Sequence, residues 1–420
     1  MNVDTRETQM NTILNKSFES LIVIRFRYMW LGDFALLCAE FMELLILSWY
    51  VLNQTNSPMI LGVYAALRFT GTLFSPFFGV IVDRLGKRNI YIFSRICFVI
   101  LSTIVMVLYI TNTISVTYVL IISPFVGLSR SLDMIVRQSV IPSIVGNRLL
   151  QNSIALLRTS RDITQIVGPI MGGVLLELLG ASFSYLVIVC LYVLALVFVL
   201  MIRDIPNDFS KSKESLILNF KQGISYALLH PFLVGILVIA FMVNLTGFPL
   251  NNGLMPVIAK DIMKTDAVGL GWMLGMYSAG ALCGSLVMGY FSNMKWVGIL
   301  MVLGALLWHV GIFFIGFVST LLVAIPLLYL IGIFQSFAMV TMAMLLMSYT
   351  SKEMLGRILG LRQLSVYGLP LGLLFSGSIA DNFDVTWALY LNGVIGFVIL
   401  VIAVVIWPST FKSDLSYQKN

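Results

Sequence analysis

The chain has 420 residues, of which 59% are hydrophobic and 11% are charged, and its mean hydropathy is +0.97. A soluble domain normally carries about 25% charged residues, so this composition excludes a soluble globular protein and indicates a membrane protein. The formal net charge of +7 does not by itself point to a nucleic-acid partner, because the distribution of the basic residues matters more than their sum.

Apolar runs recur along almost the whole chain. A helix needs about 20 residues to cross a hydrocarbon core of ~30 Å, whereas a barrel would show short alternating segments. We therefore expect an all-α membrane protein with twelve transmembrane helices in two six-helix bundles. The expected spans are residues 29–52, 59–82, 89–111, 116–139, 150–179, 182–203, 231–258, 267–291, 296–317, 319–349, 354–380 and 385–407.

The polar segments predict the orientation and the domain boundaries. With an inner N-terminus, most Lys and Arg residues fall in inner segments, and the outer loops offer only Lys260 and Lys264, as expected when basic residues stay inside. Both termini are therefore predicted to be cytoplasmic, with no cleaved signal peptide. The predicted parts are an N-terminal segment (1–28), a first bundle (29–203), a linker with an amphipathic helix (204–230), a second bundle (231–407) and a tail (408–420).

Acids buried in the first span are the expected proton-coupling residues. Charged groups are costly inside a membrane and mark functional sites, and residues 267–352 contain no acid. Glu40 and Glu43 share a helix face near mid-membrane depth, where Arg68 of the second span can pair with one of them. The other carboxylate is then poorly compensated and can take up and release a proton, with Asp33 as a third candidate. A static buried ion-pair cluster is the alternative.

Two further groups of charged residues suggest an inner gate. Arg130, Asp133 and Arg137 follow one another at i, i+3 and i+7 near the inner end of the fourth span, where they can meet the loop after the second span. Arg158, Arg161 and Asp162 lie in the inner part of the fifth span. Such opposite charges can join in one conformation and separate in another, or form a plain structural lock.

The expected cargo site combines polar and aromatic residues. The candidates are Arg68, Glu40, Tyr64, Arg130, Tyr277 and Trp308, and Trp30 and Phe334 are further aromatic candidates. Helix packing is the alternative role for each aromatic residue. The two histidines and four cysteines show no metal-binding spacing, so neither a metal nor another cofactor is expected.

The loop between the second and third expected spans carries a family signature. Its sequence GVIVDRLGKR resembles the loop motif of the major facilitator superfamily in Gly79, Asp83, Arg84, Gly86, Lys87 and Arg88. The resemblance implies that this loop is a conformational latch. The second half has a related stretch at 280–296 that lacks the Asp-Arg pair.

A second signature lies in the fifth expected span. The stretch QIVGPIMGG resembles the GPxxGG motif of the superfamily's antiporters in Gly168, Pro169, Gly172 and Gly173, and this implies outward transport. Proline and glycine also make a bend in the helix plausible there. The stretch EMLGRILGL at 353–361 and the His230-Pro231 pair resemble the branch that contains macrolide efflux proteins and the enterobactin exporter.

These patterns predict a secondary transporter. We expect a proton-coupled exporter of a small organic molecule, such as a siderophore or a drug-like compound, that works by alternating access with cargo bound near the bilayer midplane between the bundles. The alternative is an importer or uniporter of a small polar or anionic solute. The expected partners are the small-molecule cargo, protons and membrane lipid, with no nucleic acid, and the chain is expected to be a monomer. Rings of filter residues and catalytic motifs are not visible, so a channel and an enzyme are disfavoured.

Overall fold

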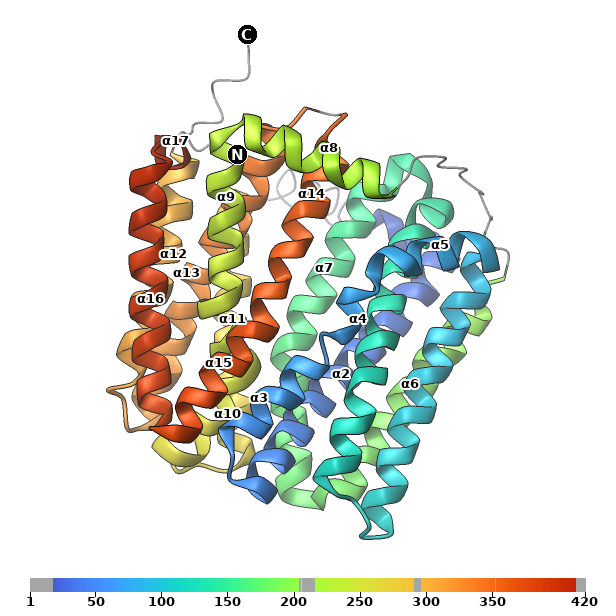
Figure 1. Ribbon diagram of the computed structural model, residues 1–420. Helices are drawn as coiled ribbons and strands as arrows, with labels where there is room; N and C mark the ends of the chain where they lie inside the picture. The colour runs from blue at the N-terminus through green and yellow to red at the C-terminus, as the bar shows by residue number, and fades with distance from the viewer. Residues whose placement is uncertain (1–17, 204, 206–215, 291–295, 352, 413–420) are drawn as a thin grey trace, which may run out of the picture. The chain divides into compact units, whose positions relative to one another are not determined.

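The computed structural model describes residues 18–203, 205, 216–290, 296–351 and 353–412, and within these ranges the chain forms helices and no strand (Figure 1). Nine of the described helices are long and apolar enough to cross a membrane. The helices of the first half are η1 (Glu19–Ile22), α2 (Ile24–Thr55), α3 (Pro58–Leu67), α4 (Thr70–Leu73), α5 (Ser75–Leu85), α6 (Lys87–Ile110) and α7 (Val116–Met201).

The second half begins with the short helix α8 (Leu216–Leu229). The seventh membrane span, Pro231–Ile262, is interrupted by π-helical turns, which are rare and concentrate at functional sites. The remaining elements are α9 (Pro231–Met242), η2 (Val243–Gly247), η3 (Leu250–Leu254), α10 (Met255–Val257), η4 (Ile258–Ile262), α11 (Ala267–Tyr290), α12 (Val297–Ile315), α13 (Leu321–Ser348), α14 (Leu355–Leu364), η5 (Ser365–Tyr367), α15 (Gly368–Asn382), α16 (Val385–Ile406) and α17 (Ser409–Lys412).

The long helix α7 contains three membrane spans. Gly146 has φ 67° and Gly180 has φ 77°, and both therefore break the helix in a backbone region that glycine adopts without steric cost. The second span is also broken, into α3, α4 and α5, with Arg68 in the first interruption. Counting α7 as three spans and α3–α5 as one gives the expected twelve among the described residues. The predicted all-helical membrane fold is confirmed.

The chain divides into two compact units. The first contains residues 1–44, 68–168 and 178–211, and the second contains residues 45–67, 169–177 and 212–420. Parts of α2, α3 and α7 from the sequence's first half therefore pack with the helices of the second half. The domain boundaries given above stay a prediction.

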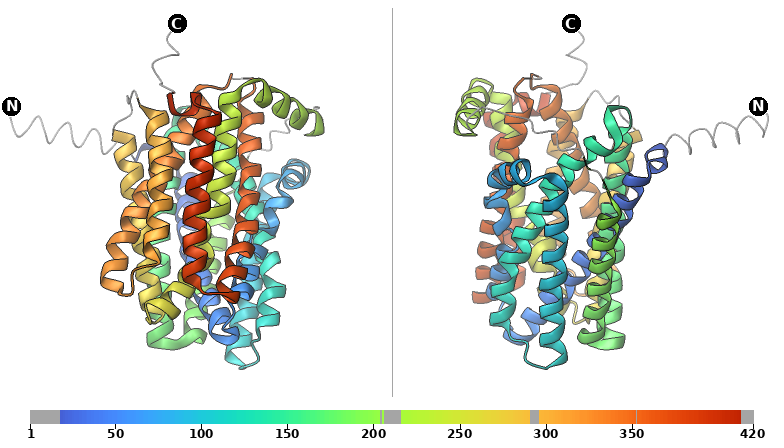
Figure 2. Two further views of the ribbon diagram at one scale, coloured as in Figure 1. Left: turned by 60° about the vertical axis from the view of Figure 1, so that its left-hand side comes forward. Right: turned by 90° about the vertical axis from the view of Figure 1, so that its right-hand side faces the viewer.

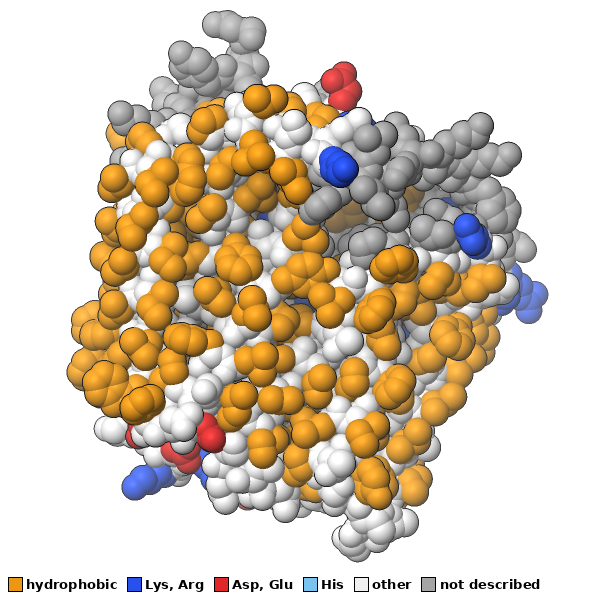
Figure 3. All heavy atoms as spheres, in the orientation of Figure 1, with side chains coloured by type: hydrophobic (Ala, Val, Ile, Leu, Met, Phe, Trp, Pro, Cys, Tyr) orange, Lys and Arg blue, Asp and Glu red, His pale blue; other side chains and the backbone are white. Residues whose placement is uncertain are grey.

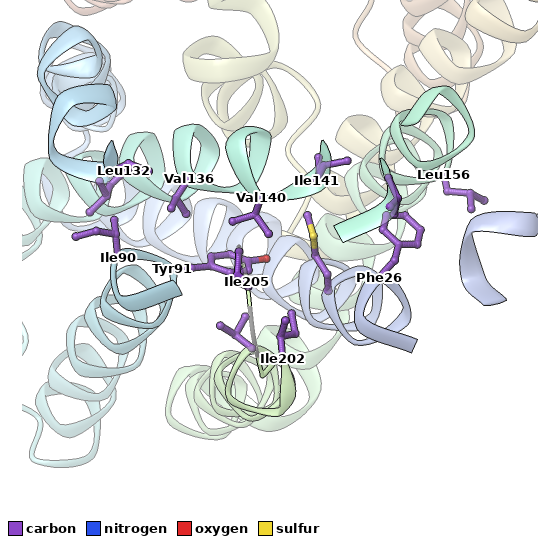
Figure 4. Close-up of a cluster of buried hydrophobic side chains, with 14 residues drawn as sticks. Phe26, Ile90, Tyr91, Leu132, Val136, Val140, Ile141, Leu156, Ile202 and Ile205 are labelled. Atoms are coloured by element: carbon purple, nitrogen blue, oxygen red, sulfur yellow. The ribbon is translucent and has the colours of Figure 1, made fainter. Parts of the chain in front are cut away.

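The first compact unit has an apolar core at the start of α2. Leu132, Val136 and Val140 line one face of α7, and Figure 4 shows them directed toward Ile90, Tyr91 and the other core side chains. The spacing of four residues places these three side chains on one stripe of the helix. This core fixes α2, α6 and α7 against one another where the charged residues described below lie.

Close helix crossings through glycine organise the second compact unit. A side chain at Gly62 of α3 would collide with the backbone of Leu373, and one at Gly377 with that of Pro58, so α3 and α15 approach closely only because both positions lack a side chain. Figures 1 and 2 show α9, α12, α15 and α16 running side by side, with hydrophobic side chains covering their outer face in Figure 3. Such a face is the one that lipid covers.

Candidate functional site

A buried ion cluster joins α2, α6 and α7 in the first compact unit. Arg95 of α6 forms ion pairs with Asp33 of α2 and with Asp133 of α7, and the second of these measures 3.0 Å from Nε to Oδ1. Arg137 of α7 approaches the other Asp33 oxygen at 3.4 Å. Asp33 and Arg95 are fully buried and Asp133 is 3% exposed. Two acids and two arginines balance in charge, which burial requires.

Neutral groups add hydrogen bonds to this ion cluster. Tyr91 donates from its hydroxyl to Asp33 Oδ1 at 2.9 Å and accepts from Arg95 Nη2 at 2.9 Å. Ser94 donates to Asp133 Oδ1 at 3.1 Å, and Arg95 Nη1 donates to the carbonyl oxygen of Gly32 at 3.4 Å. Because each buried charge has several partners, the cluster acts as one network. Removing one member leaves a remaining buried charge without compensation.

Glu40 forms a second ion pair, two turns further along α2. Its Oε1 lies 2.7 Å from Nε of Arg130 on α7. The Arg130 side chain is 30% exposed, whereas that of Glu40 is 5% exposed, and the guanidinium also lies 5.9 Å from the ring centroid of Phe69. The Arg130 end of the pair is therefore the end that another molecule can reach.

Glu43 is buried in a different environment. Its Oε2 accepts a hydrogen bond from the Tyr192 hydroxyl at 3.2 Å, and it makes no ion pair with any residue that the structure describes. Arg68 acts electrostatically on both Glu40 and Glu43. Of the two glutamates expected to carry protons, Glu43 is thus the one held by a neutral hydroxyl, because the ion pair of Glu40 is with Arg130.

Sequence reasoning missed three of these residues. Arg95 lies inside the third span, in the stretch IFSRICF. A lone arginine in an apolar run is itself a sign of a functional or ion-paired residue. Tyr91 and Tyr192 gave no such signal, because a tyrosine in a span is common. Among the described side chains, Asp133 pairs with Arg95 and Arg137 with Asp33, and the expected link of this group to the loop stays a prediction because the Asp83 side chain is outside the described part. Arg161 lies near enough to act electrostatically on Glu40.

The loop signature forms the turn between α5 and α6. Gly86 has φ 86° and ψ 132°, a conformation that favours glycine, and so ends α5 and starts α6. Lys87 donates from Nζ to Ser143 Oγ at 2.9 Å, and Arg88 donates from Nε to the carbonyl oxygen of Ile202 at 2.9 Å. Arg84 is exposed, and the side chain of Asp83 lies outside the described part. A side chain at Gly79 would meet nothing within 4 Å.

The second signature forms close contacts with neighbouring helices. A side chain at Gly168 would collide with Phe41 of α2, and one at Gly173 with the backbone of Ala267. The non-helical dihedral angles of α7 lie at Gly146 and Gly180, and the chain keeps helical dihedrals at Pro169 and Gly172, so the bend expected there stays a prediction. The motif serves close helix packing in this structure.

The aromatic candidates pack between helices. Tyr64 and Trp308 are fully buried and Tyr277 is 3% exposed. Trp308 meets Phe248 edge to face, with ring centroids 5.1 Å apart. The packing alternative therefore describes these side chains in this structure, and a cargo-binding role for them stays a prediction. Trp30 donates from its indole nitrogen to the carbonyl oxygen of Leu156 at 3.4 Å.

A set of polar contacts ties the turn after α2 to the second half of the chain. Ser57 donates to Asp381 Oδ1 at 2.6 Å, and the amide of Met59 reaches the same oxygen at 3.4 Å. Lys260 donates from Nζ to Asn56 Oδ1 at 2.6 Å. These contacts lie at the ends of α2 and α15 that are predicted to be outer, and all five residues belong to the second compact unit. No group of residues suited to holding a metal ion occurs in the described part of the chain.

The helical membrane fold with its buried ion pairs is the setting in which the family comparison is made. Residues 16–417 match the protein family described as "Transmembrane secretion effector", and the chain belongs to this family of the major facilitator superfamily. Membership confirms the resemblance to the major facilitator superfamily, and the protein is a transporter and not an enzyme.

Similar proteins of known role are distant but span most of the chain. The staphyloferrin A transporter of Staphylococcus aureus is 21% identical over 375 residues, which are 88% of this chain and 92% of that protein. Macrolide efflux protein A of Streptococcus pyogenes is 21% identical over 91% of this chain and 95% of its own. The enterobactin exporter EntS of Shigella boydii is 23% identical over 56% of each chain.

Solved structures show the same fold. The crystal structure of the POT family transporter PepTSo superposes with a TM-score of 0.75 at 13% identity, covering 93% of this chain and 99% of that one. At this identity the likeness establishes the fold alone.

Proposed function

We propose that this protein is a proton-coupled secondary transporter that exports a small organic molecule by alternating access. The observation that carries the proposal is the environment of Glu43, a buried carboxylate bonded to the Tyr192 hydroxyl and without an ion pair in the described residues. Burial favours the neutral form of such a group, whereas the ion pair of Glu40 with Arg130 favours the charged form. Glu43 is thus the proton carrier, and Glu40 with Arg130 links it to the cargo.

The ion cluster around Arg95 has a structural role in this proposal. Asp33 is held there by two arginines and a tyrosine, so it is a weaker candidate for proton exchange than Glu43. Asp133 and Arg137 instead connect α2, α6 and α7 near the loop signature. This arrangement supports a latch that includes Lys87 and Arg88 and that rearranges together with the cluster.

The cargo is proposed to be a siderophore or a drug-like compound. The named relatives transport staphyloferrin A, macrolides and enterobactin, and the partly exposed guanidinium of Arg130 suits a carboxylate-bearing or phenolate-bearing molecule. The chain is proposed to act as a monomer in the bacterial inner membrane, with both termini in the cytoplasm. A proton entering across the membrane supplies about 2.3 kcal/mol per 100 mV of potential.

Vesicles of known orientation test both direction and coupling. Inside-out vesicles with an acidic lumen, offered enterobactin, staphyloferrin A or a macrolide, are expected to accumulate at least one of them, and a protonophore is expected to abolish the uptake. Accumulation by right-side-out vesicles in an acidic medium would instead identify an importer. Uptake that ignores the pH gradient would identify a uniporter and overturn proton coupling.

A further inference from the structure

An apolar groove of about 340 Å³ lies beneath α8 in the second compact unit. Its volume falls within the range of small-ligand sites. Because every lining side chain is apolar, the groove accommodates hydrocarbon and offers a polar molecule no side-chain hydrogen bond. The lining residues are Ile224, Ala227 and Leu228 of α8, Val234, Leu237, Val238 and Phe241 of α9, and Leu361 of α14.

The groove lies where α8 is held close to α14 at its middle and joins α9 at its C-terminal end. A side chain at Gly223, in the middle of α8, would come within 3.3 Å of Arg357 Cβ, so α8 crosses α14 closely at this glycine. Beyond the last residue of α8, His230 is extended, with φ −121° and ψ 91°, and turns the chain into α9. Figure 1 shows α8 lying across the ends of α9 and α14.

The surroundings of the groove are those of a membrane surface. Leu228 is 67% exposed and Leu229 is 75% exposed, which is unfavourable in water and favourable for a helix whose apolar face lies in the headgroup and acyl boundary. The α9 residues from Val234 to Phe241 cover about 10 Å along a membrane-spanning helix. A chain in the groove therefore lies parallel to α9, the direction that lipid acyl chains take.

A basic residue stands at the headgroup end. Lys221 is exposed and precedes Ile224 by three residues and Leu228 by seven, so it shares the groove-facing side of α8. We propose that the groove binds one acyl chain of an anionic phospholipid, whose phosphate pairs with Lys221. This inference does not depend on the proposed transport function, because it concerns lipid binding alone.

Native mass spectrometry of the purified full chain tests the proposal. Phosphatidylglycerol and phosphatidylcholine with identical acyl chains are titrated separately, and the wild-type protein is expected to retain phosphatidylglycerol at least fivefold more. Val238→Trp fills the groove and is expected to reduce this retention at least fivefold. Leu229→Trp, an exposed position on α8 outside the groove, is the matched control and is expected to leave retention unchanged.

Lys221→Gln tests the headgroup contact. It is expected to lower phosphatidylglycerol retention to the level of phosphatidylcholine, whereas Lys264→Gln, at the opposite end of the unit, is expected to have no effect. Since Val238→Trp can disturb folding, hydrogen exchange of wild-type residues 221–229 provides an independent measurement, and phosphatidylglycerol is expected to slow it more than phosphatidylcholine. Equal retention of both lipids, unchanged retention in Val238→Trp, or displacement of the lipid by a transported macrolide or siderophore would each overturn the proposal.

Discussion

Tyr192 donates its hydroxyl hydrogen bond to Glu43 at 3.2 Å, while Glu40, three residues earlier on the same helix, is held by Arg130 at 2.7 Å. Two acids with the same chemistry and nearly the same depth therefore have different partners. In the proposed mechanism, the neutral partner leaves Glu43 able to change protonation state, and the charged partner stabilises Glu40 as a carboxylate. The two glutamates should consequently respond differently to the same substitution.

Glu43→Gln is expected to reduce proton-driven cargo accumulation at least tenfold while cargo exchange without a pH gradient continues. Glutamine keeps the shape and can accept the Tyr192 hydrogen bond, but it cannot carry a proton. Accumulation and exchange in proteoliposomes measure the two activities. The control is Glu177→Gln, an exposed acid at the end of the fifth span. Full accumulation by Glu43→Gln would show that the proton is carried elsewhere.

Glu40→Gln is expected to impair both accumulation and exchange, because it leaves Arg130 without its ion-pair partner. The double variant Glu40→Gln/Arg130→Gln removes both charges and should recover part of the exchange activity. A binding assay with the transported compound separates loss of affinity from loss of turnover. If Glu40→Gln behaves as Glu43→Gln does, the two acids share one role.

Arg95→Leu is expected to destabilise the first compact unit by about 3–5 kcal/mol, since it leaves Asp33 and Asp133 buried with too little positive charge. Arg95→Leu/Asp133→Leu restores the charge balance and should regain part of the loss. Thermal unfolding of the purified variants measures the effect. A melting temperature for Arg95→Leu equal to that of the wild type would contradict a network held by this arginine.

Two glycines of the second span should tolerate alanine differently. At Gly71 a side chain would collide with the backbone of Gly127, so Gly71→Ala is expected to cost about 1–3 kcal/mol of stability. At Gly79 a side chain meets nothing within 4 Å, so Gly79→Ala is expected to leave stability unchanged. Thermal unfolding compares them directly. A large effect on transport at Gly79 with unchanged stability would mean that this glycine is needed in another conformation.

If the predicted outer ends separate during transport, the hydrogen bond between Ser57 and Asp381 must break. The double variant Ser57→Cys/Asp381→Cys is made in a protein without the four native cysteines, and its two new cysteines are joined by a short, reducible bifunctional reagent. The crosslinked protein is expected to lose transport and to regain it when the crosslink is reduced. The pair Ser376→Cys/Asn392→Cys, at a hydrogen bond between α15 and α16, is the control. Continued transport with the first pair crosslinked would exclude movement at this contact.

The amino-acid sequence determined the class of the protein. Hydropathy alone fixes helical spans in a bilayer, because every backbone group must be bonded within its own helix there, and the loop signature identified the superfamily. The loop signature also placed Gly86 between the second and third spans, where the structure gives it a positive φ between α5 and α6. The few charged residues within the spans also indicated the acidic residues of α2 as the candidate functional site.

Only the tertiary structure decided which charges meet. Partner choice depends on helix rotation and on a few ångströms of depth, which residue counting does not resolve, so Arg68 was expected where Arg130 forms the ion pair and Arg95 was overlooked. The breaks at Gly146 and Gly180, in contrast, fall between expected spans, because a loop at glycine is a local feature of the sequence. Spans follow from local composition, whereas pairing follows from the three-dimensional arrangement of those spans.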